Sequence, residues 1–182
     1  MINFKASYHL STEYLKKNVN NEYEKFPASF VEIQTKQKDD IFALMHTAKL
    51  WQTENNGKTT FASDIAHDAY YDNHIQTAKI FALTKQKNNF ENLIPEKILA
   101  LMEVLPRGKK LQEIIFLQVS PEKNFNNKNR EYKNIGKSFV TSLINLFPQK
   151  DIVLEPLENA RKFYLKLGFE NQLLSRTVRY YA

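Results

Sequence analysis

The segment EIIFLQV, residues 113–119, and the segment GKSFVTSLINLF, residues 136–147, decide the fold of this chain. The first is a nearly continuous apolar run, which predicts a central strand covered on both faces. In the second, apolar residues recur every three to four positions, which predicts a helix that Pro148 prevents from continuing. We therefore expect a buried strand, a polar loop and a helix in direct succession.

A second strand and helix follow the first pair. The apolar residues of Asp151–Leu154 predict another buried strand, and residues 158–167 place their apolar side chains on one side of a helix. Gly168 then stands at the left-handed position that commonly ends a helix. Residues 173–181 alternate enough to predict a final strand or hairpin.

The preceding part of the chain predicts one strand, two helices and a pair of strands. Residues 30–35 alternate as a strand does, and helices are expected over residues 39–51 and 63–71. Residues 79–84 and 98–105 are apolar runs separated by a turn-like segment, which predicts two antiparallel strands. This order of elements predicts a single α/β domain with a mixed sheet over residues 28–182.

Residues 1–27 predict an N-terminal appendage to that domain. Leu15, Val19 and Tyr23 recur at a spacing of four after Ser11, a residue type that caps helices. The stripe is thin. We therefore expect a peripheral helix that either stands apart from the domain or forms part of it.

The composition excludes several classes of protein. The 182 residues fit one domain, and the lack of cysteine excludes disulfide scaffolds, thiolate metal sites and a cysteine nucleophile. No apolar run is long enough to span a bilayer, and the first ten residues lack the apolar stretch of a signal peptide. We therefore expect a cytoplasmic protein without a membrane partner. The net charge of +6 suits an anionic ligand, either a phosphorylated cofactor or a nucleic acid.

The loop that enters the helix at residue 136 is the candidate anion site. The first turn of a helix presents unpaired N–H groups and partial positive charge, which suits phosphate. Two lysines add full charges, and glycine lets a ligand approach the backbone closely. The predicted cradle comprises Tyr132, Lys133, Asn134, Ile135, Gly136 and Lys137.

The string NARKFYLKLGF, residues 159–169, together with the strand, loop and helix before it, resembles the GNAT superfamily of N-acetyltransferases. The resemblance covers roughly residues 79–169. The family's phosphate loop reads Gln or Arg, two residues, Gly, one residue, then Gly or Ala, and it aligns with residues 131–136. Glu131 and Asn134 depart from that pattern, although asparagine tolerates the left-handed backbone that the first glycine adopts. Residues 124–129 are interpreted as an insertion.

The resemblance implies a mixed, mostly antiparallel sheet flanked by helices, and an acetyl-CoA dependent enzyme that acetylates a primary amine by direct attack. Glu113 would be the general base, because a glutamate opens the same strand in the histone acetyltransferase branch. Tyr164 would hydrogen-bond or protonate the departing thiolate, and Asn159 would contact the pantetheine arm or cap its helix. Leu117 and Val119 would supply backbone hydrogen bonds to that arm or to the developing oxyanion.

The sequence leaves the acceptor and the oligomeric state open. The acceptor is a small amine, an aminoglycoside, a protein amine or an aminoacyl-tRNA, and the protein is a monomer or a homodimer.

Other interpretations accompany the enzymatic one. Tyr164 suits a core aromatic beside Phe163, and Glu113 suits the solvent edge of a strand. The basic loop, in which aromatic residues are interleaved, also suits single-stranded nucleic acid. Its residues are Lys123, Phe125, Lys128, Arg130, Tyr132, Lys133 and Lys137. The alternative function is thus a nucleic-acid-binding or regulatory protein on a degenerate acyltransferase fold.

A metal site is not predicted. The histidines and aspartates of the second helix do not reproduce a compact zinc pattern, since the two histidines stand seven positions apart. These residues are His67, Asp68, Asp72 and His74.

Overall fold

A computed structural model describes residues 6–71, 78–121, 131–172 and 175–182. The four helices are α1 (Lys38–Glu54), α2 (Phe61–Tyr71), α3 (Ile135–Leu146) and α4 (Arg161–Leu165), with 3₁₀ turns at Pro95–Lys97 and Glu158–Ala160. The strands are β1 (Ser7–Lys17), β2 (Tyr23–Ile33), β3 (Lys79–Thr84), β4 (Ile98–Pro106), β5 (Leu111–Val119), β6 (Tyr132–Lys133), β7 (Asp151–Leu154), β8 (Glu170–Asn171) and β9 (Val178–Tyr180).

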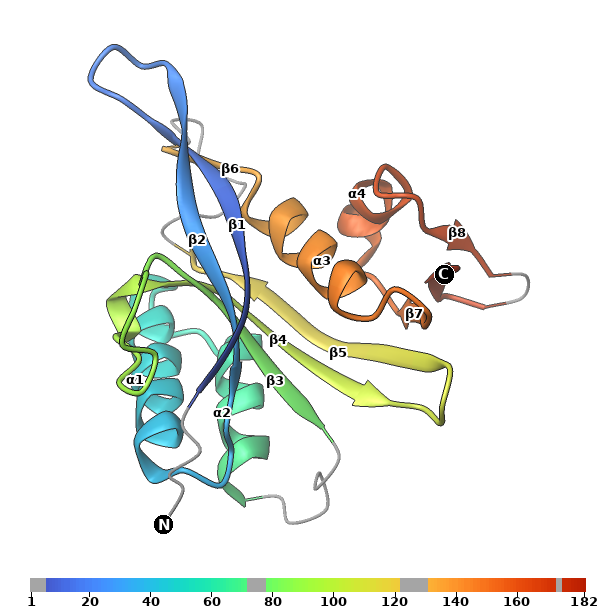
Figure 1. Cartoon of the computed structure of the whole chain (residues 1–182), viewed down its shortest axis with the longest axis horizontal. Coiled ribbons are helices and arrows are strands. Elements are labelled where there is room, and N and C mark those ends of the chain that lie inside the picture. The colour runs from blue at the N-terminus through green and yellow to red at the C-terminus, as the bar shows by residue number, and fades with distance from the viewer. Residues whose placement is uncertain (1–5, 72–77, 122–130, 173–174) are drawn as a thin grey trace.

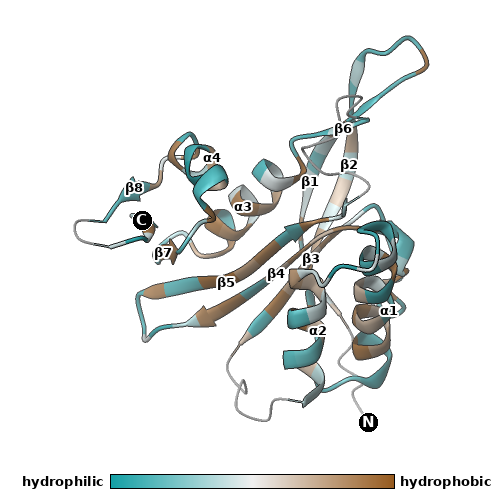
Figure 2. Cartoon of the chain, turned by 180° about the vertical axis from the view of Figure 1, so that it is seen from behind, coloured by the Kyte–Doolittle hydropathy of each residue, from teal (hydrophilic) through white to brown (hydrophobic). Residues whose placement is uncertain are grey.

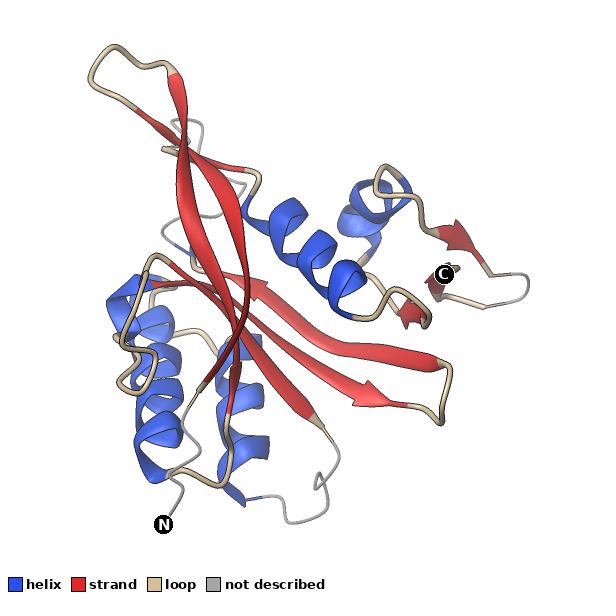
Figure 3. Cartoon of the chain, in the orientation of Figure 1, coloured by secondary structure: helices blue, strands red, loops and turns tan. Residues whose placement is uncertain are grey.

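All nine strands form one sheet in the order β6-β1-β2-β3-β4-β5-β7-β9-β8. Every neighbouring pair is antiparallel except β5 and β7, which run parallel. Helices α1 and α2 cover one face of the sheet, and α3 and α4 cover the other (Figures 1 and 3). The prediction of a mixed, mostly antiparallel sheet flanked by helices is confirmed.

Two apolar cores lie on the two faces of the sheet. Phe139 and Leu143 of α3 pack with Met102 of β4 on one face, whereas Trp51 of α1 packs with Leu101 of β4 on the other. Strand β4 is buried over its first seven residues because it contributes side chains to both cores, and Figure 2 shows its apolar character. The chain therefore holds α3 and the α1–α2 pair in fixed positions on opposite sides of β4 and β5.

Two expectations from the sequence are wrong. Residues 7–33 form the β1–β2 hairpin instead of a peripheral helix, since Tyr14 pairs with Phe26 and Leu15 with Lys25. The four-residue stripe has no structural meaning, because Val19 lies in the exposed turn of this hairpin. The second error concerns β5, which was expected to be covered on both faces. No residue of β5 after Ile114 is fully buried, and Ile115 is exposed.

The remaining elements follow the predicted order. Helix α3 begins one residue before the predicted start, and residues 158–167 form a 3₁₀ turn followed by the short helix α4. Gly168 has the predicted left-handed backbone, with φ of 93°. The final strand is restricted to β9, and part of the predicted tail lies outside the described residues.

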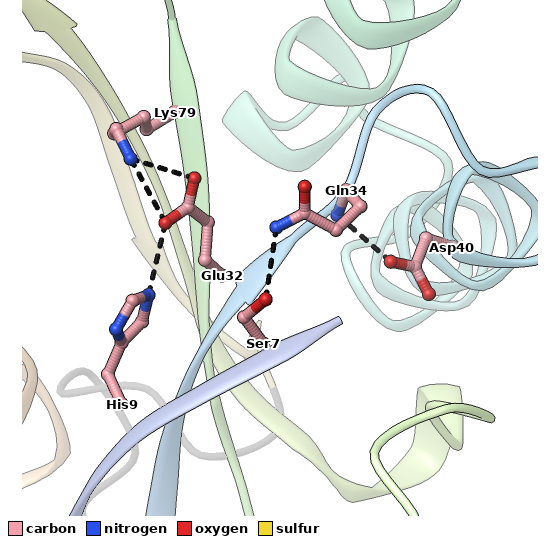
Figure 4. Close-up of polar contacts among 6 residues, drawn as sticks. All are labelled: Ser7, His9, Glu32, Gln34, Asp40 and Lys79. Atoms are coloured by element: carbon pink, nitrogen blue, oxygen red, sulfur yellow. Dashed lines mark hydrogen bonds and ion pairs between the residues drawn. The ribbon is translucent and has the colours of Figure 1, made fainter. Parts of the chain in front are cut away.

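A polar cluster joins the added strand β1 to the rest of the sheet (Figure 4). The Nε2 atom of His9 lies 3.0 Å from Oε2 of Glu32, and Nζ of Lys79 lies 3.0 and 3.1 Å from the two oxygens of the same carboxylate. Glu32 therefore links β1, β2 and β3. A half-buried carboxylate with two partners favours a single register, because a shifted strand would leave it unpaired.

Candidate functional site

Among the described residues, the backbone edge of β5 that faces β7 is open over residues 115–119. Strands β5 and β7 pair only from Leu111 to Ile114, and no strand of the described residues pairs with β5 on that side beyond Ile114. The N–H of Ser120 bonds to the carbonyl of Leu99 on β4. Because backbone groups alternate sides along a strand, those of Val119 and Leu117 point toward the open edge.

A β-bulge marks the end of the parallel pairing. On β4, Val104 pairs with Ile114 whereas Glu103 pairs with Phe116, so Ile115 is the extra residue. The bulge reverses the alternation of β5, and Ile114 faces the α3 core while Phe116 packs on the α1–α2 core. The open edge therefore begins at a backbone irregularity and not within a regular ladder.

The first turn of α3 lies beside the far end of the open edge. A Cβ atom added to Gly136 would lie 3.4 Å from Cζ of Phe163 and 3.8 Å from Cγ2 of Val119. Neither backbone nor side-chain acceptors of the described residues bond to the N–H groups of Ile135, Gly136 or Lys137. The first turn of α3, whose three amides have no partner among the described residues, thus lies next to the side chain of Val119.

The residues before α3 only partly match the predicted cradle. Asn134 has a φ of 63°, which is the left-handed backbone expected where asparagine replaces the loop glycine. It immediately precedes the helix, and its side chain makes no capping hydrogen bond. Strand β6 pairs with β1, and the bond from Lys17 N–H to the Glu131 carbonyl implies that Lys133 shares ladder bonds with β1. The amide of Lys133 is consequently directed at β1, and Ile135, Gly136 and Lys137 supply the available donors.

Lysines surround two tyrosines beside this loop. Tyr23 lies under Lys133 and Lys17, whose Nζ atoms are 3.8 and 5.7 Å from its ring centroid. The Nζ atoms of Lys16 and Lys85 are each 5.7 Å from the ring centroid of Tyr132. Glu131, the acidic departure from the loop pattern, is 3.2 Å from the Nζ of Lys16. That ion pair offsets its charge, so the surroundings of the loop remain positive.

A pocket of about 310 Å³ adjoins the start of α3 on the side of β1. Asn134, Lys137 and Ser138 line it from the helix, and Thr12 and Lys25 line it from the hairpin. Ser138 donates its hydroxyl hydrogen to the carbonyl of Glu13, which fixes this side of the helix to β1. The pocket lies beside the candidate anion site and apart from the open edge of β5.

Tyr164 lies in the α3 core, where its ring makes edge contacts with Phe163 and Phe169 at centroid distances of 5.0 and 5.6 Å. The same core holds Ile114 and Leu154, the last paired residues of β5 and β7. Burial raises the pKa of Tyr164 to about 12. The hydroxyl is therefore protonated at neutral pH. It has no hydrogen-bond partner among the described residues, so its hydrogen is available to donate.

Glu113 lies one residue before Ile114 and therefore faces the other side of the sheet. Its Oε2 atom is 2.5 Å from Nε of Arg107, in the turn between β4 and β5. The side chain of Glu113 retains 30% exposure, and its Oε1 atom has no partner among the described residues. The two candidate catalytic groups thus flank the start of the open edge from opposite faces.

Two features near β5 were not predicted from the sequence. One is Arg107, whose proximity to Glu113 follows from the hairpin that pairs Leu105 with Glu113. The other is Gln118, whose Oε1 accepts a hydrogen bond of 2.8 Å from the N–H of Ala62 at the start of α2. The tight turn after Pro106 was a signal for Arg107. Nothing in the local sequence predicts the contact of Gln118.

Asn159 does not cap α4. It lies exposed within a 3₁₀ turn, and the cap position belongs to Ala160. In the second helix, His67 lies 3.5 Å from Asp68, and the other two members of the set considered for metal lie outside the described residues. The proposed insertion at 124–129 also lies outside them. None of the described helices is both long and apolar enough to cross a membrane.

Solved structures with the same arrangement include acetyltransferases of the GNAT family. A GNAT-family acetyltransferase from Staphylococcus aureus Mu50 aligns at a TM-score of 0.51 and 16% identity, over 84% of this chain and 97% of that one. Tetrahymena GCN5 aligns at 0.53 and 9% identity, over 80% and 90%. A mutant of the toxin AtaT, bound to the C-terminus of the antitoxin AtaR and acetyl-CoA, aligns at 0.50 and 12% identity, over 84% and 92%.

The described part of the chain therefore has the fold of the GNAT acetyltransferases. No protein-family model matches the sequence, and a search of curated proteins finds no match. The similarity is thus one of fold.

Proposed function

We propose that this protein is an acetyl-CoA dependent N-acetyltransferase that transfers acetyl to a primary amine in a ternary complex. One observation carries the proposal. The strand edge that carries the outward backbone groups of Leu117 and Val119 ends beside the first turn of α3, where the amides of Ile135, Gly136 and Lys137 have no partner among the described residues. A strand edge that ends at a helix N-terminus suits a ligand with an extended amide-containing arm and a phosphate group.

The length of the open edge fits such a ligand. At about 3.3 Å per residue, the strand runs roughly 16 Å from Val119 back to Ile114. The pantetheine arm would pair with Val119 and Leu117, and the phosphates would bind the first turn of α3. The lysines around Tyr23 and Tyr132 add positive charge beside that turn. The thioester would then lie near Ile114, where β5 and β7 join.

Glu113 and Tyr164 take complementary roles in this proposal. An amine with a pKa near 10.4 is mostly protonated at neutral pH, and only its neutral form attacks a thioester. Glu113 would accept the proton at Oε1, directly or through water, from one face of the sheet. Tyr164 would donate a hydrogen bond to the sulfur from the other face.

The raised pKa of Tyr164 defines its contribution more narrowly. Transfer of a proton from a group with a pKa of about 12 to a thiolate with a pKa near 8.5 is unfavourable by about 5 kcal/mol. We therefore propose that Tyr164 stabilises the thiolate by hydrogen bonding and keeps its proton. A backbone N–H of the open edge would stabilise the developing charge on the carbonyl oxygen.

The alternative of a nucleic-acid-binding or regulatory protein is not favoured. The lysine and tyrosine cluster suits any anionic ligand, but a nucleic-acid surface does not need an open strand edge beside free helix amides. The cluster also adjoins the proposed phosphate site, so one anionic cosubstrate accounts for both features.

Thermal unfolding with and without acetyl-CoA tests the proposal. A ligand at 100 times its dissociation constant adds about 2.7 kcal/mol of stability, which is a clear upward shift in Tm. Gly136→Asp should abolish the shift, since it places a carboxylate at the phosphate site. Gly136→Ala is the control, because its Cβ meets Phe163 at an ordinary contact distance of 3.4 Å. No shift for the unmodified protein at millimolar acetyl-CoA would refute the proposal.

A further inference from the structure

Arg107 lies in the turn between β4 and β5, beside the proposed base Glu113. Its Nε atom bonds to Oε2 of Glu113, and its side chain is 52% exposed. Neither Nη atom donates a hydrogen bond to a described residue. The guanidinium therefore uses one edge to hold Glu113 and presents its terminal pair of N–H groups to solvent.

This geometry leaves the proposed base functional. The bond from Nε occupies only Oε2, whereas Oε1 of Glu113 has no partner among the described residues. Arg107 thus fixes the orientation of the carboxylate without occupying the oxygen that would accept a proton. The Nη atoms and Oε1 belong to the same ion pair, so an acceptor bound at the Nη atoms would lie close to Oε1 of Glu113.

The two Nη groups favour one kind of ligand. Guanidinium presents two parallel N–H donors whose spacing matches a carboxylate, and such bidentate pairs combine geometric specificity with charge. The same positive charge repels an acceptor that carries only ammonium groups. A second guanidinium, that of Arg179, lies on the same face two strands away, where it bonds to Asp151 at 2.5 Å.

We infer that the acceptor is an amine that also carries a carboxylate, as an amino acid does, and that the Nη atoms of Arg107 bind this carboxylate and direct the amine toward Oε1 of Glu113. The inference rests on the proposed acetyltransferase function. It makes Arg107 a positioning residue for Glu113 and a specificity-determining residue for the acceptor.

Matched acceptors test the inference. Acetylation of free amino acids is compared with acetylation of the corresponding amino acid amides, which keep the amine but lack the carboxylate. The unmodified protein should prefer the acids by roughly 10- to 100-fold in kcat/KM, as expected for a charged hydrogen-bonded pair. Arg107→Gln should remove the preference by raising KM for the acids, whereas KM for the amides should not rise.

Two controls separate this inference from the proposed function. Lys109→Gln removes a positive charge from the same exposed turn and should leave the preference intact. The acetyl-CoA induced rise in Tm should persist in Arg107→Gln, since Arg107 lies away from the proposed phosphate site. If the unmodified protein acetylated amines without any preference for acids, the inference about the acceptor would be overturned and the proposed function would stand. Survival of the preference in Arg107→Gln would also overturn the inference.

Discussion

The buried hydroxyl of Tyr164 predicts a specific loss of stability at alkaline pH. Burial raises the pKa of Tyr164 to about 12 in the folded protein, compared with about 10 in the unfolded chain. Because the pKa is higher in the folded protein, the protonated Tyr164 contributes its full share to the free energy of unfolding below pH 10. That contribution is lost as the pH rises toward 12. At pH 11 the unfolded chain is mostly ionised at this residue and the folded protein mostly is not. The expected loss is therefore about 1.4 kcal/mol at pH 11 and about 2.7 kcal/mol in full.

Urea denaturation at pH 8, 9, 10 and 11 measures this loss. The unmodified protein should lose about 1.4 kcal/mol more than Tyr164→Phe between pH 8 and pH 11, because phenylalanine cannot ionise. Tyr14, whose pKa is also raised by burial, is present in both proteins, and its effect cancels. Tyr181→Phe, at a half-exposed position, is the matched control and should follow the unmodified protein. Parallel curves for the unmodified protein and Tyr164→Phe would refute the burial argument.

The same substitution tests the catalytic role of Tyr164. Loss of a hydrogen bond to a charged sulfur should lower kcat by roughly 10- to 100-fold, and the acetyl-CoA induced rise in Tm should remain. Full turnover in Tyr164→Phe would leave Tyr164 as a packing residue of the α3 core.

Three further substitutions test the packing around the site by urea denaturation. Gln112→Leu should stabilise the protein by about 1–3 kcal/mol, because both amide atoms of this buried side chain lack a partner among the described residues, and a decrease in stability would contradict this account. Asn134→Val should cost about 1–2 kcal/mol at a φ of 63° whereas Asn134→Gly should not, and equal effects would show that the left-handed backbone is not strained. Phe139→Ala should cost about 3–5 kcal/mol because Phe139 is fully buried between α3 and the sheet, whereas Val19→Ala in the exposed hairpin turn should change stability by less than about 0.5 kcal/mol.

Local periodicity predicted strands β3, β4 and β7 and helix α3, whereas strands β6 and β8 were not predicted. Strand β3 has the predicted bounds, and helix α3 differs from its prediction by one residue at each end. In these segments the spacing of apolar residues directly reflects which face is buried. Periodicity did not predict the N-terminal hairpin, because its side chains pack against partners on other strands. Tyr14, for example, contacts Phe26 and Tyr132. A spacing of four within one strand carries no information about such partners.

The candidate site was predictable only in part. The αL backbone of Asn134 and the free amides after it follow from rules for helix starts, which are local. Asn159 does not cap a helix, since a 3₁₀ turn precedes α4 and the N-cap of α4 is Ala160. The partner of Glu113 was missed because the contact of Arg107 depends on the register of the β4–β5 hairpin.

The sequence by itself determined strands β3, β4, β5 and β7 and helix α3, the positive charge around the loop, and the residues that match an acetyltransferase pattern. These properties depend on side-chain chemistry and on spacing within single elements. Only the tertiary structure decided that β1 and β6 extend the sheet, and that no described strand pairs with one edge of β5 beyond Ile114. It also decided that Glu113 and Tyr164 lie on opposite faces. The physical reason is that strand pairing is non-local: whether a backbone edge is free depends on segments distant in sequence.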